Sequence, residues 1–180
     1  MKIKTKRLII RDFERKDAKN ILNISKEKNI ARFMCDWSKN MNSAEDYYGF
    51  IDYIQTQNPV GKNANKRFAV VLPENDEMIG MVGFGFEETL NETEIAYFMS
   101  EKSQRKGYML DAVNTMIKWY FQMFDTKYLI ATIDSANEAS NKFILKCGFE
   151  LFEKRMPMGH FQPNMESDSY FYYRKYRDEN

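Results

Sequence analysis

Apolar residues recur with two different periods along the 180-residue chain. In the clearest helical stretch, apolar side chains fall three and four positions apart and form a single stripe. The four predicted helices cover residues 17–25, 43–58, 106–124 and 135–147. Ser43 and Asp46 have the spacing of a capping pair, so the second helix is expected to begin at Ser43.

Short runs of apolar and β-branched residues separate these helices and predict seven strands. The strands cover residues 4–12, 67–72, 78–86, 93–100, 128–133, 149–158 and 169–176. The turn-forming cluster at residues 73–76 predicts a hairpin between the second and third strands. The element order β-α-α-β-β-β-α-β-α-β-β predicts one α/β domain over residues 1–180, with helices packed on a sheet.

Charge and composition narrow the class of protein. The chain carries 27 Lys and Arg against 26 Asp and Glu, a balance that argues against a surface built to coat nucleic acid or a membrane. The longest apolar run, residues 78–86, is far shorter than the roughly 20 residues of a transmembrane helix. No signal peptide is visible, so a cytoplasmic protein is expected. Cys35, Cys147 and His160 lack zinc-site spacing, and no metal is expected.

The start of the longest helix is a candidate anion site. Gln104, Arg105, Lys106 and Gly107 lie where backbone N–H groups have no helical partners and the helix dipole is positive. A pyrophosphate is the usual occupant of such a position, and glycine lets it approach the backbone closely. The alternative is that Gly107 only begins a helix after a surface loop.

The helix at residues 135–147 is the second candidate segment. Ser135 and Glu138 have capping-box spacing, which places the helix start near Ala136. Gly148 is positioned as the left-handed residue after the helix. Asn137 then lies in the first turn, where its amide can donate to and accept from an extended ligand. The alternative is an ordinary helix-start residue.

Together the two segments resemble the acetyl-CoA-binding motifs of the GNAT superfamily of N-acetyltransferases. The pyrophosphate motif, Gln/Arg-x-x-Gly-x-Gly/Ala, is matched from Gln104 to Met109. The second motif is similar to that of the subgroup that acetylates ribosomal-protein N-termini. It is matched by Asn137, Ser140, Phe143, Lys146, Gly148 and Phe149. The segment at residues 5–11 also resembles that subgroup's first strand. Met109 replaces the usual small residue, and Ile144 lies where many relatives carry a tyrosine proposed as general acid.

The resemblance implies a fold and a co-substrate. The fold is a mixed, mostly antiparallel sheet of about seven strands with about four helices, in which two strands splay apart around pantetheine. Acetyl-CoA is the implied co-substrate. The residues implied to bind it are Phe98 and Met99 through their backbone, then Gln104, Arg105, Lys106, Gly107, Tyr108, Met109, Asn137 and Ser140.

The resemblance also implies a direct attack of a primary amine on the thioester, so neither cysteine is needed as nucleophile. Glu94 is the leading candidate for the base, acting through a water, and its alternative role is that of a solvent-facing carboxylate. Glu87, Glu88 and Asp134 are competitors for the base. Ser140 is the candidate for protonating the leaving thiolate, its alternative role being a helix-surface hydroxyl.

The acceptor amine stays open between several classes. At pH 7 an α-amine is neutral in about one molecule in ten, and a lysine amine in about one in two thousand, so a base matters less for a protein N-terminus. Alternatives are a polyamine, an amino acid or an aminoglycoside, for which the carboxylates at residues 87, 88, 92 and 94 offer contacts. A non-catalytic acyl-CoA-binding domain is the alternative outside enzymes. Both a monomer and a homodimer fit.

Overall fold

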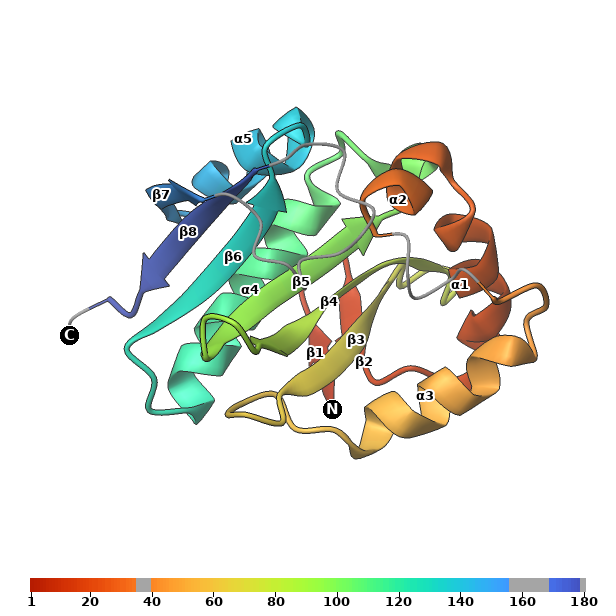
Figure 1. Cartoon of the computed structure of the whole chain (residues 1–180). Helices are drawn as coiled ribbons and strands as arrows, with labels where there is room; N and C mark the ends of the chain where they lie inside the picture. Colours follow the sequence, from red (N-terminus) through yellow and green to blue (C-terminus); the bar gives the residue numbers. More distant parts are fainter. Residues whose placement is uncertain (35–39, 156–168, 179–180) are drawn as a thin grey trace.

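One eight-stranded mixed sheet runs through the computed structural model, which describes residues 1–34, 40–155 and 169–178. The strand order is β1-β2-β3-β4-β5-β6-β8-β7, and only the pair β5–β6 is parallel (Figure 1). The strands are β1 Lys2–Lys4, β2 Ile9–Arg11, β3 Asn65–Val71, β4 Met78–Glu87, β5 Glu92–Met99, β6 Tyr128–Asp134, β7 Glu150–Arg155 and β8 Tyr170–Tyr176.

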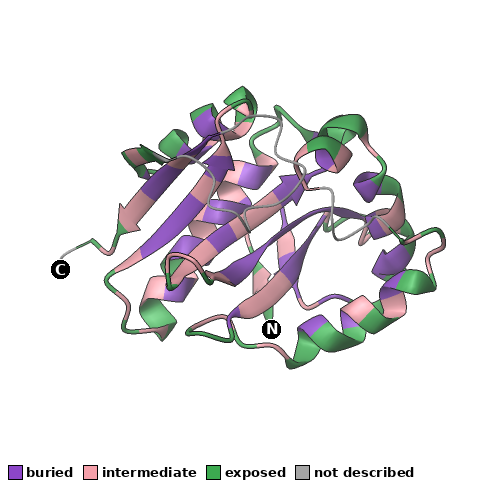
Figure 2. Cartoon of the chain, in the orientation of Figure 1, coloured by how far each residue is buried: buried purple, intermediate pink, exposed green. Residues whose placement is uncertain are grey.

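Helices cover both faces of this sheet. They are α1 Ala18–Ser25, α2 Lys28–Phe33, α3 Asp46–Thr56, α4 Tyr108–Met123 and α5 Glu138–Lys146. Side chains of α4 and α5 pack into a core on one face, and those of α1 and α3 pack into a second core on the other. Figure 2 shows the buried positions concentrated on the sheet and on the helix sides turned toward it.

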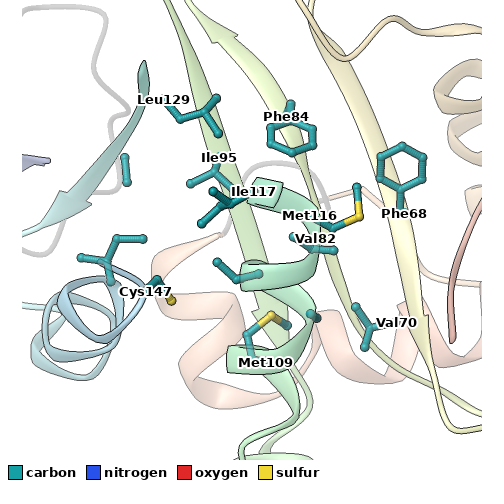
Figure 3. Close-up of a cluster of buried hydrophobic side chains, with 14 of the residues drawn as sticks. Phe68, Val70, Val82, Phe84, Ile95, Met109, Met116, Ile117, Leu129 and Cys147 are labelled. Atoms are coloured by element: carbon teal, nitrogen blue, oxygen red, sulfur yellow. The ribbon is translucent and has the colours of Figure 1, made fainter. Parts of the chain in front are cut away.

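The alternation of side chains along each strand divides the two cores. On β3, Phe68 and Val70 join the core under α4, whereas Ala69 and Val71 join the core under α1 and α3. Figure 3 shows the first of these cores, where Met116 of α4 lies among side chains of the central strands. Because both faces are covered, residues 68–71 of β3 and 78–86 of β4 are continuous apolar runs instead of alternating ones.

Two details of the predicted elements differ in the structure. The first strand is a hairpin of two short strands, β1 and β2, because the chain turns where the N–H of Thr5 donates to the carbonyl of Leu8 at 2.9 Å. The helix α2 was not predicted, since its six residues are too few to establish a period. The structure thus has eight strands and five α-helices where about seven and about four were expected, and the predicted mixed, mostly antiparallel sheet is confirmed.

Helix ends follow local chemistry. Ser43 and Asp46 form the expected reciprocal bonds. The N–H of Ser43 donates to the Asp46 carboxylate at 2.8 Å, and the N–H of Asp46 donates to the Ser43 hydroxyl at 3.3 Å. The helix α3 itself begins only at Asp46. Gly148 follows α5 with φ of +79°, as predicted. The N–H of Gly148 donates to the carbonyl of Leu145 at 3.0 Å, and the N–H of Phe149 donates to the carbonyl of Ile144 at 3.3 Å. These two bonds form a Schellman motif.

Within the described ranges, no helix combines the length and the apolar character needed to cross a bilayer.

Candidate active site

The parallel strands β5 and β6 are paired at one position only. Glu94 pairs with Ile130, and beyond this point no further residues of the two strands pair. A cleft of about 900 Å³ opens between the strands and reaches the starts of α4 and α5 and the side of α2. Separated strands leave backbone N–H and C=O groups without ladder partners, so both edges of the cleft can bind an extended ligand.

The direction of the backbone groups along β5 decides which of them face the cleft. The N–H of Ser100 donates to the carbonyl of Ile79 on β4 at 2.9 Å. Because the direction alternates, Phe98 also turns its N–H and C=O toward β4. Tyr97 and Met99 turn theirs toward the cleft. The expected contribution of Met99 through its backbone fits this register, whereas Phe98 lines the cleft without presenting its backbone.

The loop before α4 has the geometry of an anion site. Gly107 has φ of +77° and is the N-cap, so no side chain caps the first N–H groups of the helix. Arg105 also has positive φ, +61°, on the other side of Lys106. The Gln104 amide ties the loop to β5 by donating to the Met99 carbonyl at 2.9 Å. Successive N–H groups in such a loop form a concave site that suits a phosphate.

Arg7 holds this loop in place, a role that the sequence did not reveal. Its guanidinium donates to the carbonyls of Lys106 at 2.8 Å and Gly107 at 3.1 Å, and it pairs with Asp111 of α4 at 2.6 Å. It also lies over the ring of Tyr108, 5.2 Å from the centroid. These bonds hold the carbonyl groups of Lys106 and Gly107 in the loop. The only sequence signal for Arg7 is its place in the family-like segment at residues 5–11.

The start of α5 differs from the prediction. Asn137, not Ser135, is the N-cap, and its side-chain oxygen accepts from the N–H of Ser140 at 3.1 Å. Ser135 bonds the Ser169 hydroxyl at 2.9 Å, and the helix begins at Glu138, two residues later than expected. The cap engages the oxygen of Asn137, so its amide nitrogen can still donate into the cleft that Asn137 lines.

A hydroxyl pair lies on the α5 side of the cleft. The Tyr97 and Ser140 oxygens are 2.8 Å apart, and the Tyr97 ring packs against Phe143 at 4.9 Å between centroids. Burial raises the pKa of Tyr97, which keeps the phenol protonated. Ile144 is fully buried in the core and does not reach the cleft. Tyr97 was not singled out from the sequence, because nothing in β5 distinguishes it from a packing residue.

Glu94 lies beside the cleft and does not line it. Its carboxylate accepts from the N–H of Thr132 at 2.9 Å and from the Thr132 hydroxyl. Burial raises the pKa of Glu94, and the bonds from Thr132 act in the opposite direction. Of its competitors, Glu87 accepts from the N–H of Leu90 at 2.7 Å, and Asp134 accepts from Ala136 at 2.8 Å.

The predicted site residues otherwise converge on this cleft. Those that line it are Phe98, Met99, Gln104, Arg105, Gly107, Tyr108, Met109, Asn137 and Ser140. Lys106 does not line it, and contributes its carbonyl to the bond with Arg7. Cys147 is buried, which raises the pKa of its thiol to about 12. Cys35 and His160 lie outside the described residues, as do positions 156–158 of a predicted strand.

Metal ligands are not gathered anywhere in the part of the chain that the structure describes. No group of three or more His, Cys, Asp and Glu side chains there could hold an ion.

Comparisons with known proteins agree with this geometry. Residues 7–150 match the family described as acetyltransferase (GNAT) domain. The uncharacterized N-acetyltransferase YnaD of Bacillus subtilis (strain 168) is 29% identical over 175 residues, which cover 96% of this chain and 95% of that protein.

Solved structures share the fold. The ribosomal-protein-S5-alanine acetyltransferase of Vibrio fischeri superposes with a TM-score of 0.78 at 19% identity, covering 99% of this chain and 98% of that one. The microcin C7 self-immunity acetyltransferase MccE, solved with acetyl-CoA and AMP, superposes with a TM-score of 0.78 at 21% identity, covering 96% and 94%. With the family match over most of the chain, these findings show that the protein belongs to the GNAT acetyltransferase family and carries out acetyl-CoA-dependent N-acetylation.

Proposed function

We propose that acetyl-CoA lies in the cleft between β5 and β6 and that a neutral primary amine attacks its thioester directly. The observation that carries this proposal is the cleft itself, which joins the unpaired edge of β5 to the uncapped start of α4. Pantetheine bonds the backbone of Tyr97 and Met99, and the pyrophosphate binds the N–H groups of residues 105–109. The amide of Asn137 donates to the pantetheine chain from the opposite wall.

The chemistry needs a site for the developing oxyanion and two proton transfers. When the amine nitrogen bonds to the acetyl carbon, the carbonyl oxygen becomes negative, and a β5 N–H turned to the cleft stabilises it. Glu94 then takes a proton from the amine through a water. Its carboxylate does not line the cleft, but it accepts a hydrogen bond from Thr132, which does. When the carbon–sulfur bond breaks, Ser140 protonates the thiolate, and Tyr97 replaces the Ser140 proton across 2.8 Å.

The acceptor is a primary amine, and a protein N-terminal α-amine is the first candidate. The Vibrio fischeri structure is named as an acetyltransferase for the alanine of a ribosomal protein. A small-molecule amine is the second candidate, and MccE, which was solved with AMP beside acetyl-CoA, supports it. Burial raises the pKa of Glu94, which makes its carboxylate a stronger base toward either acceptor.

The test is thiol release from acetyl-CoA in the presence of a panel of amines, with mass spectrometry of the products. We expect thiol release only when an amine is present, with one acetylated amine formed per thiol. Ser140→Ala should slow turnover, and Ser135→Ala is its control at the same end of α5. Acetyl-CoA binding without turnover on any amine would instead identify an acyl-CoA-binding domain.

A further inference from the structure

An arginine crosses the sheet close to the proposed base. Arg67 lies on β3, and its side chain runs over Gly83 and Gly85 of β4. A Cβ at position 83 would lie 2.7 Å from Arg67 Cδ, and it would meet the backbone carbonyl oxygen of Lys66 first. A Cβ at position 85 would lie 2.9 Å from Arg67 Nη2, so this position needs glycine if Arg67 is to keep its path. The strand register pairs Gly85 with Glu94, so the guanidinium is next to the Glu94 strand position.

The two opposite charges do not form an ion pair. The Arg67 guanidinium donates to the carbonyls of Phe84 and, at 3.3 Å, Lys66, and among the described residues no carboxylate lies within ion-pair distance of it. Glu94 is held separately by Thr132. Partial burial lowers the pKa of Arg67, and the charge of Glu94 acts in the opposite direction from beyond contact distance.

Another arginine on this face shows the usual arrangement. Arg174 of β8 pairs with Glu92 at 3.3 Å. Buried charges are normally paired in this way, because an unpaired one keeps most of its desolvation cost. Arg67 lacks such a partner in the described part of the chain, although Glu94 lies only two strands away, on β5.

We propose that Arg67 binds an anionic group of the acceptor, a carboxylate or a phosphate placed a few bonds from the amine that Glu94 deprotonates. This inference rests on the proposed function, in which Glu94 is the base. Gly85 and Glu94 are on adjacent strands, which are about 4.8 Å apart, so one small zwitterion can contact both charges. The guanidinium fork matches the two oxygens of a carboxylate or phosphate. Arg67 and Glu94 are each only partly buried, so such a group can reach both side chains.

The same arrangement disfavours acceptors with more positive charge. A polyamine or an aminoglycoside would bring a second ammonium group close to Arg67, where little water screens the repulsion. Arg67 therefore separates the candidate acceptors by charge: an amino acid or a peptide with an acidic residue near its N-terminus is favoured, and polycations are disfavoured.

The experiment compares matched acceptors with the full-length protein. The free acceptors are an α-amino acid, its carboxamide and the corresponding α-aminophosphonate, and the peptides begin with Ser-Asp or Ser-Asn. For the wild type, kcat/KM should be at least about tenfold higher for the anionic member of a pair, as charge-assisted bidentate bonds predict. The amino acid and the aminophosphonate distinguish a carboxylate from a phosphate source, and the peptides distinguish a free acceptor from a protein N-terminus.

Variants assign the preference to Arg67. Arg67→Met should abolish the preference, so that kcat/KM for the anionic member of a pair falls at least about tenfold relative to that for its neutral partner. Arg67→Lys, which keeps the charge, should retain part of the preference. Lys62→Met removes the same charge from an exposed position just before β3 and should retain all of it. Melting temperature and acetyl-CoA affinity show that each variant is folded, and Arg67→Lys carries the test if Arg67→Met does not fold.

Two results overturn the inference: equal kcat/KM for anionic and neutral acceptors in the wild type, or an equal loss on both in Arg67→Met. A binding measurement distinguishes a failure of the inference about Arg67 from a failure of the proposed function. With CoA bound, an N-acetyl amino acid should bind more tightly than its N-acetyl carboxamide, and only through Arg67. Arg67-dependent binding without acetylation of any amine would contradict the proposed function alone. Acetylation of neutral amines without this binding difference would contradict the inference alone.

Discussion

Replacing Gly107 by alanine tests the anion site before α4. Gly107 has φ of +77°, and an added Cβ would lie 3.2 Å from Arg7 Nη2. The left-handed conformation costs a non-glycine residue roughly 1–2 kcal/mol. For a chain of this size that cost lowers the melting temperature by about 2–8 °C. The Cβ also displaces the guanidinium that holds the carbonyls of Lys106 and Gly107.

Acetyl-CoA affinity should fall at least about tenfold in Gly107→Ala, a loss of about 1.4 kcal/mol or more. Two other glycines with φ of +79° are matched controls. Gly61 has no atom within 4 Å of an added Cβ, and at Gly148 the nearest is the flexible Lys175 Nζ at 3.3 Å. Gly61→Ala and Gly148→Ala should lose similar stability and keep their affinity. Calorimetric titration measures affinity, and unchanged binding by Gly107→Ala would refute this location for the pyrophosphate.

Three further changes test the chemistry. Tyr97→Phe removes the hydroxyl bonded to Ser140 and should lower kcat about tenfold or more at saturating acetyl-CoA; an unchanged kcat would exclude Tyr97 from proton transfer. Glu94→Gln should slow turnover most near neutral pH and remove the acidic limb of the kcat–pH profile. In the wild type this limb lies above the ordinary glutamate pKa of about 4.3, since burial raises the pKa of Glu94 and the base works deprotonated. Cys147→Ala should cost about 0.5–3 kcal/mol of stability and preserve turnover, whereas loss of turnover in folded protein would contradict direct transfer.

The long elements were predictable from sequence because their packing faces are local patterns. The stripe along α4 has one apolar residue every three or four positions, and these residues pack against the sheet. The turn after α5 was predictable for the same reason, since Gly148 determines it with its immediate neighbours. The motif residues of the cofactor cleft belong to these local elements, and most of them line the cleft.

The start of α5 was predicted incorrectly because two local patterns compete there. Ser135 with Glu138 and Asn137 with Ser140 both fit a helix start. Ser169, 34 residues away in sequence, bonds the Ser135 hydroxyl and leaves Asn137 as the cap. A contact of that range is not encoded in a sequence window.

Long-range pairing also explains why three residues of the proposed site were not found from the sequence. Tyr97 and Ser140 are 43 residues apart, and Arg7 and Asp111 are 104 apart. Arg67 meets the Glu94 strand position only through the register of β3, β4 and β5. Each of these residues looks like an ordinary strand or surface residue until the sheet brings it to its partner.

A crystal structure of the protein with CoA would show directly whether the cofactor lies between β5 and β6. We expect electron density for pantetheine between these strands, bonded to the backbone of Tyr97 and Met99, with the sulfur near the Tyr97–Ser140 pair. The pyrophosphate should contact the N–H groups of residues 105–109. Density for CoA outside this cleft, or a pantetheine chain bonded to neither strand, would contradict this expectation.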